Sequence, residues 1–229
     1  SKANGEYVEW SDDFEATGAV EVWLKRLIYH QQAMLKNILS KAKLTADSWE
    51  MEKARKHWLF DYPAQIALTA SQIIWTEEVT NQFESLADGN EQAMKEYHKL
   101  LVNRLQDLIS LVLQDLSPGD RIKIITLITV DVHNCDVVQK LIEEKIIDHN
   151  QFSWQSQMRY SWVPKEQECL VHVADATFNY FYEYIGNGGR LVITPLTDRC
   201  YITLTRALRL VMGGAPAGPA GTGKTETTK

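Results

Sequence analysis

Apolar side chains recur every three or four positions through most of the first 150 residues, a pattern that predicts helices. The expected helices span residues 19–43, 47–60, 64–86 and 91–116. The second begins on Asp47-Ser-Trp-Glu50, which has the form of a capping box. The first and the last carry apolar stripes that suit packing of these two helices against each other.

The stretch 121–148 fits two kinds of element. The run from Ile122 to Val130 is rich in β-branched residues, which favours a strand. The same run places apolar side chains along one face of a helix, and Val137 to Ile147 is helical in its spacing. Periodicity alone leaves the strand and a pair of helices both open.

The pattern changes after about residue 151. Leu170–Val173 and Phe178–Tyr184 alternate and are rich in β-branched and aromatic residues, as strands are, and Arg190–Thr194 is a further extended piece. Residues 197–212 return to helical spacing. The sequence therefore predicts a mainly α protein, in which a helical bundle is followed by a short β-containing segment.

The composition is that of an ordinary folded protein, with 229 residues, 45% hydrophobic and 24% charged. The net charge of −6 argues against nucleic acid or an anionic membrane as the main partner, because both attract clustered Lys and Arg. No uncharged apolar run reaches the length of about 18 residues that a bilayer span requires.

The cysteines are Cys135, Cys169 and Cys200, odd in number and far apart, which fits a reducing compartment better than a disulfide framework. His133 and Cys135 form an H-x-C pair that could supply two metal ligands. No second pair stands at the spacing of a metal site, so a metal site is not predicted.

The most specific chemical pattern is Gly218-Pro-Ala-Gly-Thr-Gly-Lys-Thr225, which reads G-x-x-x-x-G-K-[ST]. Glycines let the backbone curl and turn its N–H groups toward a phosphate, and a helix starting here would add the positive end of its dipole. Lys224 would bring a positive charge to the β- and γ-phosphates, and the Thr225 hydroxyl would ligate Mg²⁺. The pattern thus predicts ATP and Mg²⁺ as cofactors, with Lys224 and Thr225 as the catalytic pair. The predicted binding residues of this loop are Gly218, Pro219, Ala220, Gly221, Thr222, Gly223, Lys224, Thr225 and Glu226.

Hydrolysis by this kind of site also needs an acidic residue at the end of another strand and residues that sense the γ-phosphate. None stands between Thr225 and Lys229, and the upstream residues lack the strand–helix alternation that would supply them. We therefore expect the chain to be part of a longer polypeptide, and to be inactive as an ATPase alone.

Two stretches resemble the start of the first AAA+ module of dynein heavy chains. They are Tyr184–Tyr201 (YIGNGGRLVITPLTDRCY) and Gly213–Lys229 (GGAPAGPAGTGKTETTK). Shorter upstream motifs look like the C-terminal part of the dynein linker, namely those beginning at Trp58 (WLFDYPAQ), Gln72 (QIIWT), Asp131 (DVH) and Phe152 (FSWQSQMR).

The resemblance implies a division into a helical linker over residues 1–175 and the truncated start of an α/β P-loop AAA+ domain over residues 176–229. The boundary itself is expected between about 165 and 188, in a join that lacks a Gly/Ser-rich linker and should be ordered. In dyneins the segment that matches Ile193–Asp198 wraps the adenine, which implies apolar contacts from Pro195 and Leu196.

Membership of this family would imply a minus-end-directed microtubule motor, with six AAA+ modules in a ring and the main ATPase site in the first. The implied partners are the rest of the heavy-chain ring, microtubules contacted by a distant part of the polypeptide, and dynein intermediate and light chains. Ala215-Pro-Ala217 and Glu226-Thr-Thr228 look more like ciliary than cytoplasmic heavy chains, which implies a location in the axoneme.

Two other classes of function stay open on the residues alone. One is a regulatory module that binds a nucleotide without hydrolysing it, and the acidic residue of the following strand would decide that case. The other is a structural helical scaffold with a coincidental glycine loop, which a failure to bind any nucleotide would favour.

Overall fold

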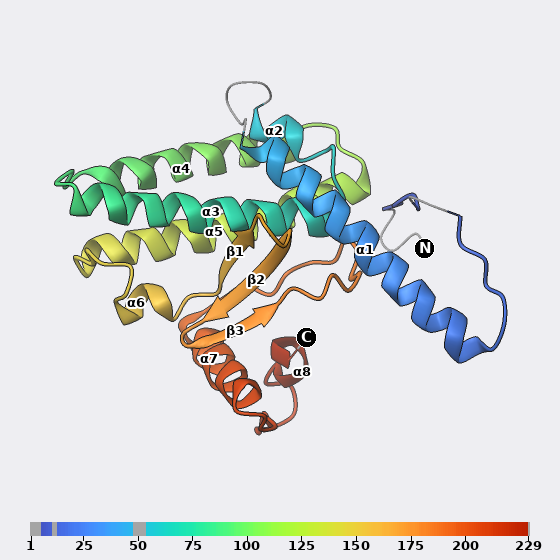
Figure 1. Ribbon diagram of the computed structural model, residues 1–229. Coiled ribbons are helices and arrows are strands. Elements are labelled where there is room, and N and C mark those ends of the chain that lie inside the picture. Colours follow the sequence, from blue (N-terminus) through green and yellow to red (C-terminus); the bar gives the residue numbers. More distant parts are fainter. Residues whose placement is uncertain (1–5, 11–12, 48–53, 229) are drawn as a thin grey trace.

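The computed structural model describes residues 6–10, 13–47 and 54–228 and is mainly helical, with one small sheet (Figure 1). The long helices are α1 (Val20–Ala46), α3 (Ala64–Ala87), α4 (Ala93–Val112), α5 (Pro118–Glu143) and α7 (Pro195–Arg209). The short helices are α2 (Arg55–Trp58), α6 (Phe152–Gln155) and α8 (Lys224–Thr228). Three antiparallel strands pair in the order β1 (Arg159–Val163), β2 (Glu168–Val173) and β3 (Ala176–Asn179).

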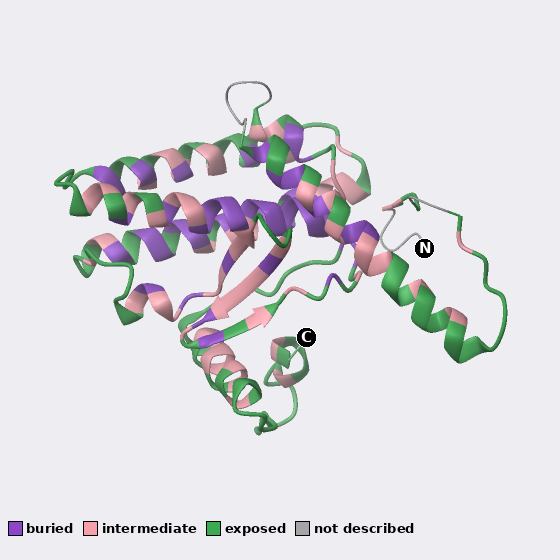
Figure 2. Cartoon of the chain, viewed as in Figure 1, coloured by how far each residue is buried: buried purple, intermediate pink, exposed green. Residues whose placement is uncertain are grey.

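Helix α3 lies at the centre of the molecule and is buried on most of its surface (Figure 2). Residues on all of its sides are enclosed, among them Ile66, Ala67, Ile73 and Val79. The main partner of α1 is α3, whereas α4 packs mainly against α5 and α3. The predicted packing of α1 and α4 against each other is therefore wrong as the main contact of either helix, because α3 offers the apolar surface that both cover.

Residues 118–143 form one continuous helix, so neither a strand nor two helices exist in this stretch. The helix begins cleanly, since Pro118 occupies its first turn and the Ser117 hydroxyl accepts a hydrogen bond from the Asp120 N–H at 3.1 Å. Ile124 and Leu127 are fully buried. Tertiary burial of one helical face overrides the strand preference of the β-branched residues.

The predicted helix over residues 47–60 is wrong in its extent. Asp47 ends α1, and its carboxylate accepts a hydrogen bond from Lys43 at 2.5 Å instead of capping a new helix. Ala54 is extended, with ψ of 138°, and α2 begins only at Arg55. The remaining residues of the predicted capping box lie outside the described residues.

The strands differ from the prediction in three places. Leu170–Val173 lies within β2 as expected, but only the first two residues of Phe178–Tyr184 belong to β3. Arg190–Thr194 is not a strand, because no described strand pairs with it. The first strand, Arg159–Val163, was not predicted, and it packs against α3.

The Tyr180 N–H still donates to the Cys169 carbonyl of β2 at 2.9 Å, but residues 181–185 continue beyond β3 without a strand beside them, and the buried amide of Gln65 takes the place of one. Its Nε2 donates to the Tyr180 hydroxyl at 2.8 Å and to the Glu183 carbonyl at 2.7 Å. Its Oε1 accepts from the Ile185 N–H at 3.0 Å. The segment thus satisfies its backbone groups through a side chain of α3 rather than through a β-ladder.

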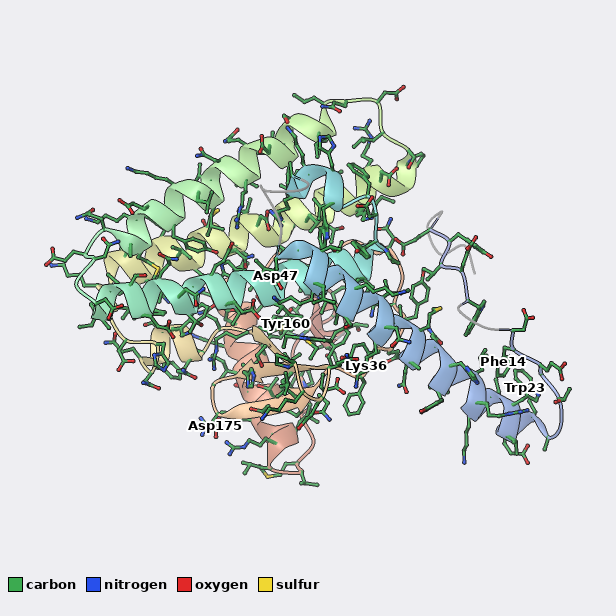
Figure 3. All side chains as sticks on the ribbon, turned by 45° about the horizontal axis from the view of Figure 1, so that its top comes forward. Phe14, Trp23, Lys36, Asp47, Tyr160 and Asp175 are labelled. Atoms are coloured by element: carbon green, nitrogen blue, oxygen red, sulfur yellow. The ribbon has the colours of Figure 1, made fainter. Side chains whose placement is uncertain are left out.

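Two further contacts join the sheet and the segment that follows it to the helices. Asn187 donates to the Gly119 carbonyl of α5 at 2.8 Å. Lys36, which is labelled on α1 in Figure 3, forms an ion pair with Glu168 of β2 at 2.8 Å. Position 175/176, where a domain boundary is predicted, falls in the turn between two paired strands. The boundary stays a prediction, and the join around it is ordered and docked.

Exposure is uneven along the chain. The first half of α1 is largely exposed and neither α7 nor α8 has a buried residue, whereas the core lies around α3 (Figure 2). Among the helices described, none has both the length and the apolar character needed to cross a membrane.

The contacts of Gln65 make a direct prediction for stability. Gln65→Leu keeps the volume but leaves the Glu183 carbonyl and the Ile185 N–H without their partner. Glu183 and Ile185 are exposed, so water partly replaces the lost partner. At about 0.5–1.5 kcal/mol for each hydrogen bond lost, we expect the free energy of unfolding to fall by about 1–3 kcal/mol. Urea denaturation measures this change.

The control is Gln139→Leu on the exposed face of α5, where the glutamine amide bonds only Glu143. That variant should unfold within about 0.5 kcal/mol of the unaltered chain. Equal effects of the two substitutions would show that the amide of Gln65 does not hold the segment.

Candidate nucleotide-binding site

The first turn of α7 carries two of the predicted site residues, Pro195 and Leu196, and both are exposed. Thr194 and Thr197 cap each other, since the Thr197 N–H donates to the Thr194 hydroxyl at 3.3 Å and the Thr194 N–H to the Thr197 hydroxyl at 2.7 Å. Pro195 is the first helical residue, so the helix starts two residues before the predicted position. Leu196 is 71% exposed and is available for contact with a ligand or with another part of the protein.

Asp198 in the first turn of α7 lies near ionisable side chains of α5. Burial raises the pKa of the Asp198 carboxyl, while His133 and Lys140 of α5 act in the opposite direction. Burial likewise lowers the pKa of His133, against the influence of Asp198 and Asp136. Asp198 thus lies near enough to His133 and Lys140 for their charges to act on it, but burial has the larger effect on both Asp198 and His133.

The chain turns back along α7 after the helix ends. A Cβ atom at Gly214 would lie 2.3 Å from Leu204 Cδ2, so the returning segment approaches the helix at a distance that glycine alone allows without a shift. The candidate phosphate loop follows directly on this segment.

The loop has the backbone that its glycines permit. Gly221 and Gly223 have φ of 80° and 77°, in the left-handed region. The Thr222 hydroxyl donates to the Pro219 carbonyl at 2.9 Å, which closes the turn. Helix α8 begins at Lys224, as the pattern predicts, and Thr227 N–H donates to the Gly223 carbonyl at 2.9 Å.

The Lys224 ammonium folds back into the loop. Its Nζ donates to the carbonyls of Gly218 and Pro219 at 2.9 and 2.5 Å, and lies 3.3 Å from the Thr222 hydroxyl. All of these partners are neutral, whereas an ionised phosphate would add the attraction between opposite charges to the hydrogen bond. A phosphate entering the loop would therefore compete well for the lysine.

The other predicted loop residues lie on the surface. Ala220, Thr225 and Glu226 are exposed, and the Thr225 side chain leaves from the first turn of α8. Its hydroxyl oxygen is the type of ligand that Mg²⁺ accepts. The described residues contain no cluster of three or more His, Cys, Asp or Glu side chains that could hold a metal ion by themselves.

His133 and Cys135, the H-x-C pair, play no part in this site. Cys135 is buried, and burial raises the pKa of its thiol to about 11, so it stays protonated near neutral pH. His133 instead faces the start of α7, a position that the sequence pattern did not indicate.

Sequence reasoning missed the residues that support the site from outside the motif. The reciprocal cap was visible as Thr194 and Thr197 around Pro195, a helix-start signal. The close approach of Gly214 to Leu204 had no signal in the sequence, because it depends on how the chain turns after α7.

Comparison with known proteins agrees with this geometry. The family described as "Hydrolytic ATP binding site of dynein motor region" matches residues 180–229, which include the start of α7 and the glycine loop. The class of site is therefore a nucleotide-binding region of the dynein type.

Relatives match along nearly the whole chain. Dynein axonemal heavy chain 11 of Sus scrofa is 53% identical over 98% of this chain, and the ciliary dynein beta chain of Tripneustes gratilla is 51% identical over the same share. Dynein axonemal heavy chain 9 of Homo sapiens is 50% identical, again over 98%. The chain is thus a homologue of axonemal dynein heavy chains, and it spans 5% of the length of these relatives.

The cap of α7 leads to a local prediction. Thr194→Val removes the hydroxyl that accepts the Thr197 N–H, at a cost of about 1 kcal/mol for a lost cap. Amide hydrogens in the first turn of α7 should then exchange about fivefold faster, which hydrogen exchange measured by NMR would detect.

Thr203→Val is the matched control, since Thr203 is exposed in the middle of the same helix and its hydroxyl bonds only the Arg199 carbonyl. In the Thr203→Val variant, the amides in the first turn of α7 should exchange as in the unaltered chain. Unchanged exchange in Thr194→Val would mean that the cap does not fix the start of α7.

Proposed function

We propose that this chain forms part of the main ATP site of an axonemal dynein heavy chain, together with the end of the linker that moves over it. The observation that carries the proposal is the Lys224 ammonium within a loop of left-handed glycines at the start of a helix. The match of residues 180–229 to the dynein ATP-binding region supports it.

In the proposed site, the backbone N–H groups of residues 218–225 surround the β-phosphate. Lys224 would leave its loop carbonyls for the β- and γ-phosphate oxygens, and the Thr225 hydroxyl would help to hold Mg²⁺, which would neutralise negative charge on the phosphates. Pro195 and Leu196 form an apolar contact for the adenine, a role that the exposure of Leu196 permits.

Residues 1–175 act, in this proposal, as the end of a lever. A lever transmits movement only when it is stiff and joined without slack to the ATPase module. The hydrogen bonds from Gln65 to residues 180–185 and from Asn187 to α5 support such a join. They bind the segment that leads into α7 directly to the helical part.

The names of the relatives suggest the cellular setting. Their axonemal and ciliary origin supports a location in the axoneme and a role as a microtubule motor. The remaining AAA+ modules of the ring, microtubules, and the intermediate and light chains are the proposed partners.

The experiment uses an axonemal dynein heavy chain in which this sequence replaces the homologous segment. Lys224→Ala removes the charge that faces the phosphates, and a hydrogen bond to a charged group contributes about 1.5–3 kcal/mol. We expect the dissociation constant for ATP at the first module to rise by at least about tenfold. Titration with a fluorescent ATP analogue measures it.

Lys165→Ala, an exposed lysine in the turn between β1 and β2, controls for the loss of one positive charge. Its affinity for ATP should equal that of the unaltered protein. If Lys224→Ala also bound ATP normally, the loop would not be the phosphate site and the proposal would fail.

A further inference from the structure

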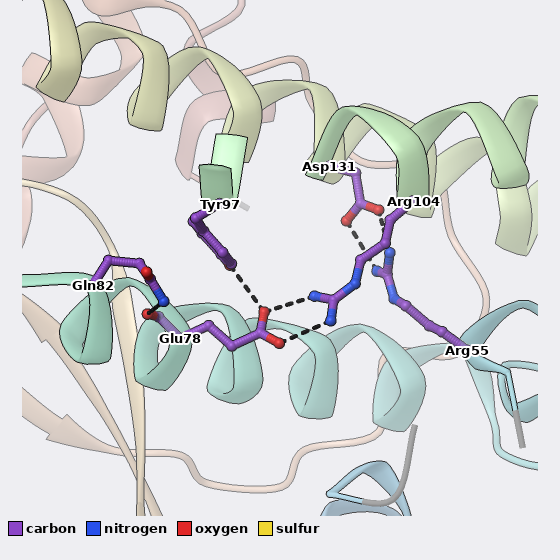
Figure 4. A network of polar contacts seen from close by, with 6 residues as sticks. All are labelled: Arg55, Glu78, Gln82, Tyr97, Arg104 and Asp131. Atoms are coloured by element: carbon purple, nitrogen blue, oxygen red, sulfur yellow. Dashed lines mark hydrogen bonds and ion pairs between the residues drawn. The ribbon is translucent and has the colours of Figure 1, made fainter. Parts of the chain in front are cut away.

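A polar layer lies inside the helical part, between α3, α4 and α5 (Figure 4). The Arg55 guanidinium pairs with the Asp131 carboxylate at 2.5 and 3.0 Å, and Arg104 pairs with Glu78 at 2.7 and 2.9 Å. The Tyr97 hydroxyl also donates to Glu78, at 2.9 Å. Each arginine forms two hydrogen bonds with its carboxylate, so the charges of both ion pairs are well compensated.

Beside this layer, four enclosed side-chain atoms have no hydrogen-bond partner among the described residues. They are Ser71 Oγ, Gln72 Nε2 and Trp75 Nε1 on α3, and Asn134 Oδ1 on α5. Trp75 and Asn134 are only 3% and 2% exposed. A buried polar atom without a partner costs about 1–3 kcal/mol, so a group of four requires an explanation.

Two small pockets lie against these atoms. One of about 10 Å³ is lined by Ser71, Trp75 and Asn134 together with both ion pairs. The other, of about 50 Å³, is lined by Gln72, Trp75 and Asn134. Arg190 and Ile193 also line it. A water molecule needs roughly 10–15 Å³ and two to four polar partners.

We propose that these pockets are binding sites for ordered water. In the larger site, water accepts hydrogen bonds from the N–H groups of Gln72 and Trp75 and donates to Asn134 Oδ1. In the smaller site, a single water bonds the Ser71 hydroxyl and donates to an oxygen of the Glu78 or Asp131 carboxylate, which also line that pocket. The ligand of the smaller site is neutral, because the charges of the two arginines and two carboxylates beside that pocket already balance each other.

The larger site has a structural consequence. Arg190 and Ile193 precede α7, whereas Gln72, Trp75 and Asn134 belong to the helical part. Water in this pocket is therefore held by the helices at the place where the segment that leads into the candidate nucleotide site covers them. The inference does not depend on nucleotide binding.

A crystal structure of the 229-residue chain, at a resolution that shows ordered water, tests the proposal directly. We expect density for water within about 2.7–3.2 Å of both Trp75 Nε1 and Asn134 Oδ1. A pocket without density, or protein atoms that bond all four groups instead, would overturn it.

A second measurement distinguishes hydrated from dry polar groups. Asn134→Leu removes the acceptor. If water is bound, this substitution leaves the water and its donors short of a partner, and the melting temperature should fall by about 2–4 °C or more. If the amide oxygen is dry, removing it should raise the melting temperature, because an unsatisfied buried group is lost.

The control is Asn81→Leu, an exposed position inside α3 that carries the same change in helix propensity. The comparison is made between the two variants. A melting temperature of Asn134→Leu equal to or above that of Asn81→Leu would contradict the proposal.

Discussion

The side-chain amide of Gln65 is the contact on which the arrangement of this chain depends. After Tyr180, whose N–H still bonds β2, residues 181–185 leave the sheet before α7 begins, and no described strand pairs with them. Gln65 supplies both a donor and an acceptor to their backbone, as a neighbouring strand would. Without it, two backbone groups of this segment would lose their protein partners, and the link between the helices and α7 would loosen.

The position of the candidate phosphate loop follows from this link. Once residues 180–187 are fixed on α3 and α5, the cap formed by Thr194 and Thr197 sets where α7 starts. The close approach at Gly214 then returns the chain along α7 and leads it to the glycine loop. The candidate nucleotide site is thus joined to the helices through side-chain hydrogen bonds.

How far the sequence predicts this structure depends on whether the signal is local. The span of α3 was predicted to within one residue at its end, and the glycine loop followed by a helix at Lys224 was predicted from eight residues. Both signals lie within a short stretch of chain.

The predictions are wrong where contacts between residues far apart in the chain determine the local structure. Ile122–Val130 is helical because α3 and α4 bury one of its faces, and the β-branched run at Arg190–Thr194 forms no strand because no described strand pairs with it. The partners of Gln65 lie more than 110 positions away along the chain, so no local pattern could indicate them. The predicted ATP contacts of Pro195 and Leu196 rest on resemblance and not on such a pattern.

The most direct measurement is the hydrogen-exchange rate of the Ile185 amide in the unaltered chain. If Gln65 Oε1 accepts its hydrogen, this amide should exchange as slowly as the amide of Val171, which lies in the central strand, although Ile185 itself belongs to no strand. Exchange at the rate of an unprotected peptide would contradict the role given to Gln65. It would show that residues 180–185 are not fixed on α3.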